Sequence, residues 1–340
     1  MASNLLKFHI QTIKSTDLST QFLPTRTLFS SLPFPTQQKY HQHHSHLSFF
    51  PKKQTHNSKV PLLSIHSSLS SSTPPTSKEE AILQAKTCLS TTLEKPLNNP
   101  KLAGKLKKKK QPRFQVEIPV IDDSPESLSQ LAFDIFGDIP IKRKGSPVRI
   151  LIIWPNPTLA EAAIQAFESH SSTQVEQIDI SSVTNGDTRF LNSADVVAFL
   201  APEASQLAVM KSVTDSVYPK PVVVFNPGWG FEEESNFGEL SGFVGSFEVI
   251  YSFIGLEVRG VLSKRKGVVF KCVRDGILSG ERWTISVEEE GKLKVISRFK
   301  ERPSIGEVEN VLYNLMAINS PITKSAKFLR DLVSNVTGKK

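Results

Sequence analysis

Three short apolar runs constrain the fold of this chain more than any other feature. They read VRILIIWP, DVVAFLAP and PVVVFNP, at residues 148–155, 195–202 and 221–227. Each run ends in proline and is far shorter than the ~20 residues that a transmembrane helix needs. A strand that is apolar on both faces is typical of the middle of a parallel sheet, where helices cover both sides. The runs therefore predict buried parallel strands.

Amphipathic helix patterns separate these strands. TLAEAAIQAFESH (158–170) follows the first run, and EASQLAVMKSVTDSVY (203–218) follows the second. Ahead of them, RFQVEIPV (113–120) alternates as a strand does, and SPESLSQLAFDIFG (124–137) predicts a helix with Ser124 as N-cap. Alternating strands and helices of this length predict an α/β fold, a three-layer sandwich with a mostly parallel, Rossmann-like sheet.

The pattern changes after residue 245. Four segments with strand character follow with little helix between them, at residues 247–260, 267–276, 282–289 and 292–300. Because turns that contain glycine join them, we expect antiparallel strands that extend one edge of the sheet. Two helix patterns close the chain, at residues 304–319 and 320–336, each with a serine at its start.

The basic charge of the chain is concentrated near its start. The formal net charge is +8, and residues 1–78 hold eight Lys or Arg against one acid, so the rest of the chain is nearly neutral. The start is also rich in Ser and Thr and lacks a continuous apolar segment, as is typical of a plastid transit peptide. We therefore expect residues 1–70 to be a disordered chloroplast transit peptide and the mature protein to lie in the stroma.

Three further segments complete the predicted organisation. Residues 71–112 form an N-terminal helix and basic linker, 113–320 the α/β domain and 321–340 a C-terminal helix. The linker ends in four lysines, Lys107, Lys108, Lys109 and Lys110. Such a run is typical of a solvated loop, and a peripheral contact with the anionic thylakoid surface stays open as the alternative. We expect no transmembrane segment and no nucleic-acid partner.

Ligands of such sheets bind beyond the carboxyl ends of the strands. The loop at residues 154–158 lacks the glycines of a dinucleotide site, and the Walker A spacing occurs nowhere in the chain. Thr158 with Glu161 is interpreted as a capping box, Glu203 as a similar helix-start acid and Asp179 as a strand-end acid facing water. Acids at these positions repel a phosphate. We therefore expect no bound cofactor.

Other chemistry finds equally little support. His170 is the only histidine after residue 78, so a Ser or Cys triad would depend on that one base. Cys88 and Cys272 are far apart and lack CxxC spacing, and they are interpreted as incidental small apolar residues. We expect neither a catalytic residue nor a metal site.

The turn NPGWGFEE, residues 226–233, carries the best candidate for a binding surface. Aromatic residues outside periodic segments either cap a core or face a partner. Trp229 and Phe231 are the candidate partner-facing residues, with Asn226 and Trp154 at neighbouring strand ends.

Several segments together resemble a plastid and cyanobacterial family catalogued as a domain of unknown function, which includes the Low PSII Accumulation proteins. They are EEAILQAK, RFQVEIPV, VVVFNPGW, FEVIY, GVVFKCV and RWTI, in this order, and the resemblance covers about residues 77–320. Seven positions match the family as fold-defining residues: Pro119, Asn226, Pro227, Phe247, Glu248, Tyr251 and Trp283. The resemblance supplies no catalytic residue.

This resemblance implies a soluble chloroplast protein that acts by protein binding in photosystem II assembly, either as the assembly factor itself or as a sibling. Its partner would be a photosystem II subunit or another assembly factor. The alternative is a small-molecule or nucleotide-binding α/β enzyme of the stroma that uses the strand-end loops. An open pocket at residues 154–158, 201–205 and 226–231 with converging polar groups would favour the enzyme, whereas a filled crevice beside an exposed aromatic patch would favour the binding protein.

Overall fold

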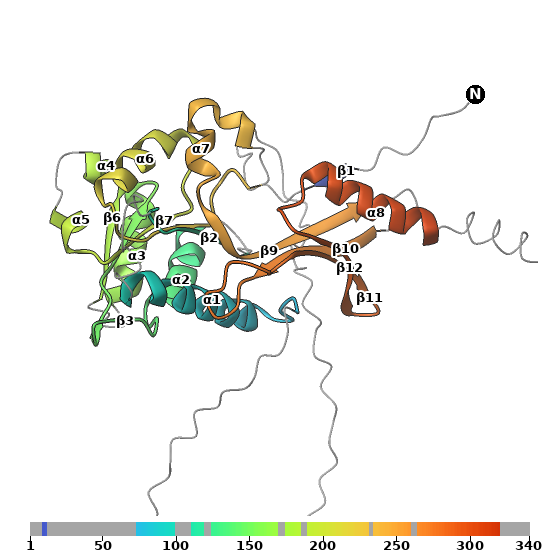
Figure 1. Ribbon diagram of the computed structural model, residues 1–340, viewed down its shortest axis with the longest axis horizontal. Helices are drawn as coiled ribbons and strands as arrows, with labels where there is room; N and C mark the ends of the chain where they lie inside the picture. Colours follow the sequence, from blue (N-terminus) through green and yellow to red (C-terminus); the bar gives the residue numbers. More distant parts are fainter. Residues whose placement is uncertain are drawn as a thin grey trace, which may run out of the picture.

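One mixed sheet runs through the fold (Figure 1). The computed structural model describes residues 9–11, 73–98, 110–118, 124–168, 174–184, 189–230, 234–259 and 264–319. Within these residues the strand order is β12-β11-β10-β9-β2-β8-β7-β5-β6. The parallel strands are β2 (Arg113–Glu117), β5 (Ile150–Trp154), β6 (Val175–Asp179), β7 (Val196–Leu200), β8 (Val222–Phe225) and β9 (Glu248–Arg259).

Antiparallel strands extend this sheet beyond β9, as the sequence predicts. They are β10 (Lys264–Cys272), β11 (Trp283–Glu289) and β12 (Lys292–Phe299). The pairing of β9 with β10 and that of β10 with β11 keep one register throughout. The pairing of β11 with β12 shifts its register between Ile285 and Ser286. The mostly parallel sheet with an antiparallel extension is thus confirmed.

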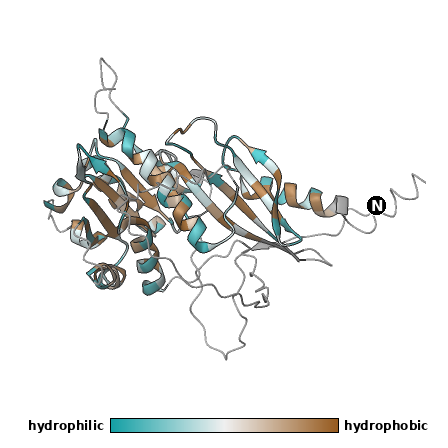
Figure 2. Ribbon diagram, turned by 90° about the horizontal axis from the view of Figure 1, so that it is seen from below, coloured by the Kyte–Doolittle hydropathy of each residue, from teal (hydrophilic) through white to brown (hydrophobic). Residues whose placement is uncertain are grey.

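Three helices cover one face of the sheet. They are α1 (Lys78–Asn98), α2 (Pro125–Phe136) and α3 (Pro157–Glu168). Their apolar sides and the facing strand residues, such as Val116, Ile152 and Phe270, form one continuous buried core. Figure 2 shows the apolar colour along the strands beneath these helices. This face is the first outer layer of the sandwich.

Further helices cover the opposite face in two groups. One group lies over the parallel strands: α4 (Ile180–Thr184), α5 (Arg189–Ser193), α6 (Leu207–Ser216) and α7 (Ser241–Val244), with the 3-10 helices η2 (Ala204–Gln206) and η3 (Glu234–Leu240). The other is α8 (Ile305–Asn319), which packs on the antiparallel strands through Val308 and Leu312. Figure 1 shows this division above the sheet. The three layers are therefore present.

Local capping explains where the helices begin. The Ser124 side chain accepts a hydrogen bond from the Ser127 backbone N–H at 3.2 Å, as predicted, and Pro125 occupies the first turn of α2. For α3 the predicted capping box of Thr158 was wrong. Asn156 Oδ1 accepts the Leu159 N–H at 3.0 Å instead, because Pro157 starts this helix one residue earlier.

Some elements differ from the expectation. A short hairpin, β3 (Lys142–Arg143) with β4 (Ser146–Pro147), was not predicted. A three-residue strand, β1 (His9–Gln11), pairs antiparallel with β9 inside the segment expected to be a disordered leader. The predicted helix at 321–340 and the lysines Lys107, Lys108 and Lys109 lie outside the described residues. Among the described helices, none is both long and apolar enough to cross a membrane.

Candidate functional site

The loops at the carboxyl ends of the parallel strands bond to one another. Gln206 Nε2 donates to the Pro155 carbonyl at 2.8 Å, which joins the loop after β7 to the loop after β5. The Gly228 N–H donates to the Pro202 carbonyl at 2.9 Å, which joins the loops after β8 and β7. These polar groups are therefore used in holding the loops together at the edge where α/β enzymes bind ligands.

Asn226 ties the end of β8 to the end of β2. Its backbone N–H donates to the Val116 carbonyl at 2.9 Å, and its Oδ1 accepts the Ile118 N–H at 2.7 Å. The residue adopts φ +48°, a left-handed conformation that asparagine tolerates better than most residues. Its Nδ2 is buried without a hydrogen-bond partner among the described residues. Asn226 thus acts on the fold, closing a corner between two central strands.

The two candidate tryptophans are buried. Trp229 is 5% exposed and packs edge-on against Phe237, with ring centroids 6.1 Å apart, in the core under α6 and α7. Trp154 is fully buried, and its Nε1 donates to Gln177 Oε1 at 2.8 Å. This burial corrects the expectation of an exposed aromatic patch at these two residues, because the glycine turn folds the Trp229 indole inward. Phe231 lies outside the described residues.

The acids near the strand ends cap helices. Asp179 accepts the N–H groups of Ser181 and Ser182 at 2.9 and 3.1 Å, at the start of α4. Burial acts to raise the pKa of Asp179, but the hydrogen bonds from the two serines outweigh it and leave the pKa lowered. Glu203 forms a capping box with Gln206 at the start of η2. Within the described residues no cluster of three or more His, Cys, Asp or Glu is placed to hold a metal ion.

A buried charged cluster lies at the end of β2, where Glu117 is 6% exposed. The Glu117 carboxylate accepts from Gln115 Nε2 at 2.7 Å and from Ser252 Oγ at 2.6 Å. Arg302, in the loop after β12, places Nη1 2.9 Å from Glu117 Oε1 and stacks its guanidinium over the Trp283 ring at 5.4 Å. The carboxylate is therefore well satisfied, and the cluster joins the central strand β2 to the antiparallel part of the sheet.

A second ion pair extends this cluster. Lys271 Nζ lies 2.9 Å from Glu248 Oε1 and 5.6 Å from the centroid of the Trp283 ring. Trp283 therefore lies against two cations, which its π face favours. Sequence reasoning missed this arrangement, although Glu117 as a single acid between apolar residues in a strand was a usable signal. The family resemblance implied only that Trp283 and Glu248 define the fold, and these contacts agree with that expectation.

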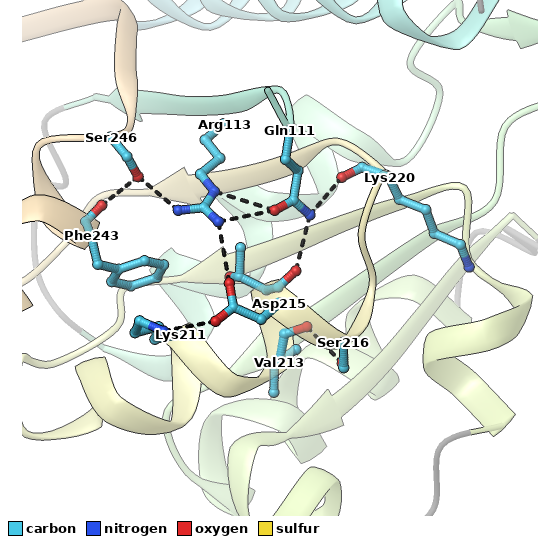
Figure 3. A network of polar contacts seen from close by, with 10 residues as sticks. Gln111, Arg113, Lys211, Val213, Asp215, Ser216, Lys220, Phe243 and Ser246 are labelled. Atoms are coloured by element: carbon cyan, nitrogen blue, oxygen red, sulfur yellow. Dashed lines mark hydrogen bonds and ion pairs between the residues drawn. The ribbon is translucent and has the colours of Figure 1, made fainter. Parts of the chain in front are cut away.

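At the amino ends of the parallel strands, a polar network joins β2 to α6 and α7 (Figure 3). Gln111 Nε2 donates to the carbonyls of Thr214 and Lys220, both at 3.0 Å. Arg113 donates to Gln111 Oε1 and to Ser246 Oγ, and its guanidinium lies 5.4 Å from the Phe243 ring centroid. This network fixes the chain at the start of β2, shortly after the lysine-rich segment in the sequence.

Cations cluster at this same edge. The β3–β4 hairpin exposes Lys142, Arg143 and Lys144, and its turn uses Lys144 at φ +51° and Gly145 at φ +88°. Asn98, the last residue of α1, holds the hairpin: Nδ2 donates to the Lys142 carbonyl at 2.8 Å and Oδ1 accepts the Lys144 N–H at 3.1 Å. We call Lys142, Arg143 and Lys144 the basic hairpin.

Lys220 and Arg149 lie near the basic hairpin. Arg143 pairs with Asp195, whose carboxylate also accepts the Arg149 N–H at 3.0 Å. Burial lowers the pKa of Lys220, with a further decrease from the positive charges of Arg143 and Arg149 and an opposing effect of Asp195. Of the described residues that flank the lysine-rich segment, Asn98 bonds to the basic hairpin, and Gln111, which follows Lys110, bonds to the Lys220 carbonyl.

Comparison with known proteins places the chain in a family. A family model described as "Domain of unknown function (DUF1995)" matches residues 75–310. No curated protein matches the sequence. Among solved structures, the flagellar accessory protein FlaH from Methanocaldococcus jannaschii is 11% identical, covering 54% of this chain and 90% of that chain, with a TM-score of 0.26. That likeness is too low to support an inference, whereas the family model spans most of the chain. The chain belongs to the DUF1995 family, which is defined by a domain of unknown function.

Proposed function

We propose that this chain is a chloroplast stromal protein that acts by binding other proteins during photosystem II assembly. Its partner is a photosystem II subunit or another assembly factor. The proposal rests on the resemblance of its strand and helix segments to the Low PSII Accumulation proteins, of which it is the third or a sibling. Membership of the DUF1995 family is consistent with this proposal and does not specify the role.

One structural observation favours a binding protein over the enzyme alternative. Polar groups of the strand-end loops form hydrogen bonds with one another: Gln206 with Pro155, Gly228 with Pro202 and Asn226 with Ile118. Enzymes of this architecture direct such groups toward a ligand in the crevice. At the carboxyl edge of this sheet, these groups instead hold neighbouring loops together by hydrogen bonds.

The opposite edge offers the surface for a peripheral contact with the thylakoid. The basic hairpin is exposed and held in place by Asn98, and Lys110, also exposed, precedes Gln111, whose side chain bonds to the Lys220 carbonyl. Lys107, Lys108 and Lys109 precede Lys110 in the sequence and add three positive charges to the same segment. An anionic membrane surface attracts such a cluster by about 1 kcal/mol for each cation near it. The thylakoid membrane surface is where photosystem II would be assembled.

Two experiments test the proposal. Disruption of the gene in a photosynthetic host is expected to lower photosystem II relative to photosystem I, and the wild-type sequence should restore the ratio. Affinity purification of the full-length protein from chloroplasts, followed by mass spectrometry, is expected to recover photosystem II subunits or assembly factors. Normal photosystem II accumulation in the disrupted line, measured by immunoblot and by low-temperature fluorescence, would exclude the proposed role.

A further inference from the structure

The fold brings the two cysteines of the chain together. Cys88 lies on the sheet-facing side of α1 and is 2% exposed, and Cys272 is the last residue of β10. Both are free thiols. Cys272 lies on the same face of β10 as Val268 and Phe270, the face that α1 covers, and it packs against that core. Sequence spacing predicted two incidental residues, whereas the structure places both at one helix–sheet contact.

Backbone contacts place the two cysteines at the same point of the sheet. Cys88 Sγ lies 3.1 Å from the Ile250 carbonyl oxygen, and the same carbonyl accepts the Val273 N–H at 2.8 Å. In the β9–β10 register, Cys272 lies opposite Tyr251, the residue after Ile250. The Cys88 thiol therefore sits over the end of β10, and the two thiols lie close enough for each to shift the pKa of the other.

The surroundings give the two thiols different reactivities. The neighbouring Cys88 side chain lowers the pKa of Cys272 and outweighs the opposing effects of burial and of the Glu281 carboxylate, while Arg274 adds a smaller decrease. The proximity of Cys272, together with burial, raises the pKa of Cys88. Cys272 is also the more exposed of the two. Because the thiolate is the nucleophile in thiol oxidation, Cys272 reacts first and Cys88 is placed to resolve the product.

We propose that Cys88 and Cys272 form a reversible disulfide that fastens α1 to β10. With a peroxide as oxidant, the Cys272 thiolate attacks one peroxide oxygen, the O–O bond breaks, and a sulfenic acid forms with release of hydroxide. The Cys88 sulfur then attacks the sulfenic sulfur, its proton leaves with the hydroxyl group as water, and the S–S bond closes. A dithiol reductant restores both thiols by exchange.

The disulfide would fix α1, a helix that also contacts the basic hairpin and the turn after β10. The far end of α1 holds the basic hairpin through Asn98, and Lys95 Nζ donates to the Gly276 carbonyl at 3.2 Å, just beyond Cys272. A covalent link at Cys88 closes a long loop of chain and limits the separation of α1 from the sheet in the unfolded state. Oxidation is therefore expected to raise the thermal stability of the protein. The inference does not depend on the proposed role in photosystem II assembly.

Thiol counting on the purified full-length protein tests the inference. Exposure of the folded chain to hydrogen peroxide, followed by alkylation under denaturing conditions, is expected to show loss of both free thiols and their return after dithiothreitol. Peptide mass spectrometry should identify the Cys88–Cys272 cross-link, and the melting temperature of the oxidised chain should rise by several degrees over that of the reduced chain.

Single substitutions distinguish this chemistry from unspecific oxidation. In the Cys88→Ser variant, Cys272 should stop at the sulfenic acid and be trapped by dimedone, while the Cys272→Ser variant should leave Cys88 reduced under the same treatment. The Cys88→Ser/Cys272→Ser variant should show no shift in melting temperature on oxidation. Retention of both thiols by the folded wild type, a link only between two chains, or an unchanged melting temperature of the cross-linked protein would overturn the inference.

Discussion

Arg302 Nη1 lies 2.9 Å from Glu117 Oε1, and this contact joins the loop before α8 to the last residue of the central strand β2. The Glu117 side chain is 7% exposed and the Arg302 side chain 26%. A carboxylate buried to this degree depends on its partners for the interactions that water would otherwise supply. The pair therefore links the parallel and antiparallel parts of the sheet through one charge contact.

Removal of this guanidinium is expected to destabilise the protein strongly. Among the described residues, Arg302→Ala leaves Glu117 with Gln115 and Ser252 as side-chain donors, and it also removes the stacking on Trp283. Loss of one partner of a buried pair costs about 3–5 kcal/mol. Urea denaturation followed by circular dichroism measures the change. Lys294→Ala is the control, because Lys294 and Glu289 form an exposed pair whose loss should cost under about 1 kcal/mol. Equal effects of the two substitutions would contradict the structural role of Glu117.

Asn226 is expected to show two separable contributions to stability. Asn226→Gly keeps the left-handed backbone conformation at φ +48° but loses the hydrogen bond to the Ile118 N–H, for about 1 kcal/mol. Asn226→Ala loses the same bond and adds a backbone penalty of about 1 kcal/mol. The order of unfolding midpoints in urea should therefore be wild type, glycine variant, alanine variant. An alanine variant as stable as the glycine variant would show that the corner relaxes.

Trp229 is expected to act on stability before it acts on any partner. Trp229→Ala removes a buried indole that packs on Phe237, and such truncations cost about 3–5 kcal/mol. Trp229→Phe keeps most of the apolar contact and should cost much less. A melting temperature lowered strongly in the first variant and slightly in the second is the expected result. A Trp229→Ala variant that melts like the wild type but loses partner recovery would instead make Trp229 a direct contact.

The parallel part of the fold was predictable because its signals are local. Val222–Phe225 and Val196–Leu200 are apolar on both faces, and no partner strand needs to be known to infer that helices cover them. The contacts between the site residues were not predictable in this way, because they join residues that are far apart in the sequence. The meeting of Cys88 with Cys272, or of Glu117 with Arg302, depends on β9 lying beside β2 and β10 beside β9. That strand order is set by long-range packing, which spacing in one sequence does not encode.

Burial of Trp229 shows a further limit of sequence patterns. An aromatic residue in a glycine turn has no periodicity, so its pattern is the same whether the ring caps a core or faces a partner. Here Gly230 adopts φ +51°, and Phe237 from η3 covers the indole. The deciding contact comes from a later segment of the chain.

The turn after β10 is expected to tolerate no side chain at Gly276. A Cβ there would lie 2.6 Å from the Thr91 carbonyl oxygen of α1, at a backbone φ of +62°. Gly276→Ala should therefore push α1 away from the turn. We expect a loss of at least about 2 kcal/mol, since strain and backbone penalty add. Gly291→Ala is the matched control, because that glycine has φ +74° and open space around its Cβ position. If both variants lose the same stability in urea, the close approach of α1 is not the cause.

The basic hairpin is expected to control binding to anionic membranes. Lys142→Glu with Lys144→Glu removes two exposed cations and adds two acids at the tip that Asn98 holds through backbone groups, so the fold should persist. At about 1 kcal/mol for each charge near the surface, binding should weaken more than tenfold. Co-sedimentation of the full-length variants with vesicles rich in an anionic lipid, at low and at physiological salt, measures this change.

Lys292→Glu with Lys294→Glu, on exposed positions of β12 at the other end of the sheet, is the matched control for net charge. Similar weakening by both double variants would assign the attraction to overall charge and remove the basic hairpin as the docking surface. Neutral vesicles should bind none of the variants, and salt should reduce the binding of the wild type more than that of the hairpin variant.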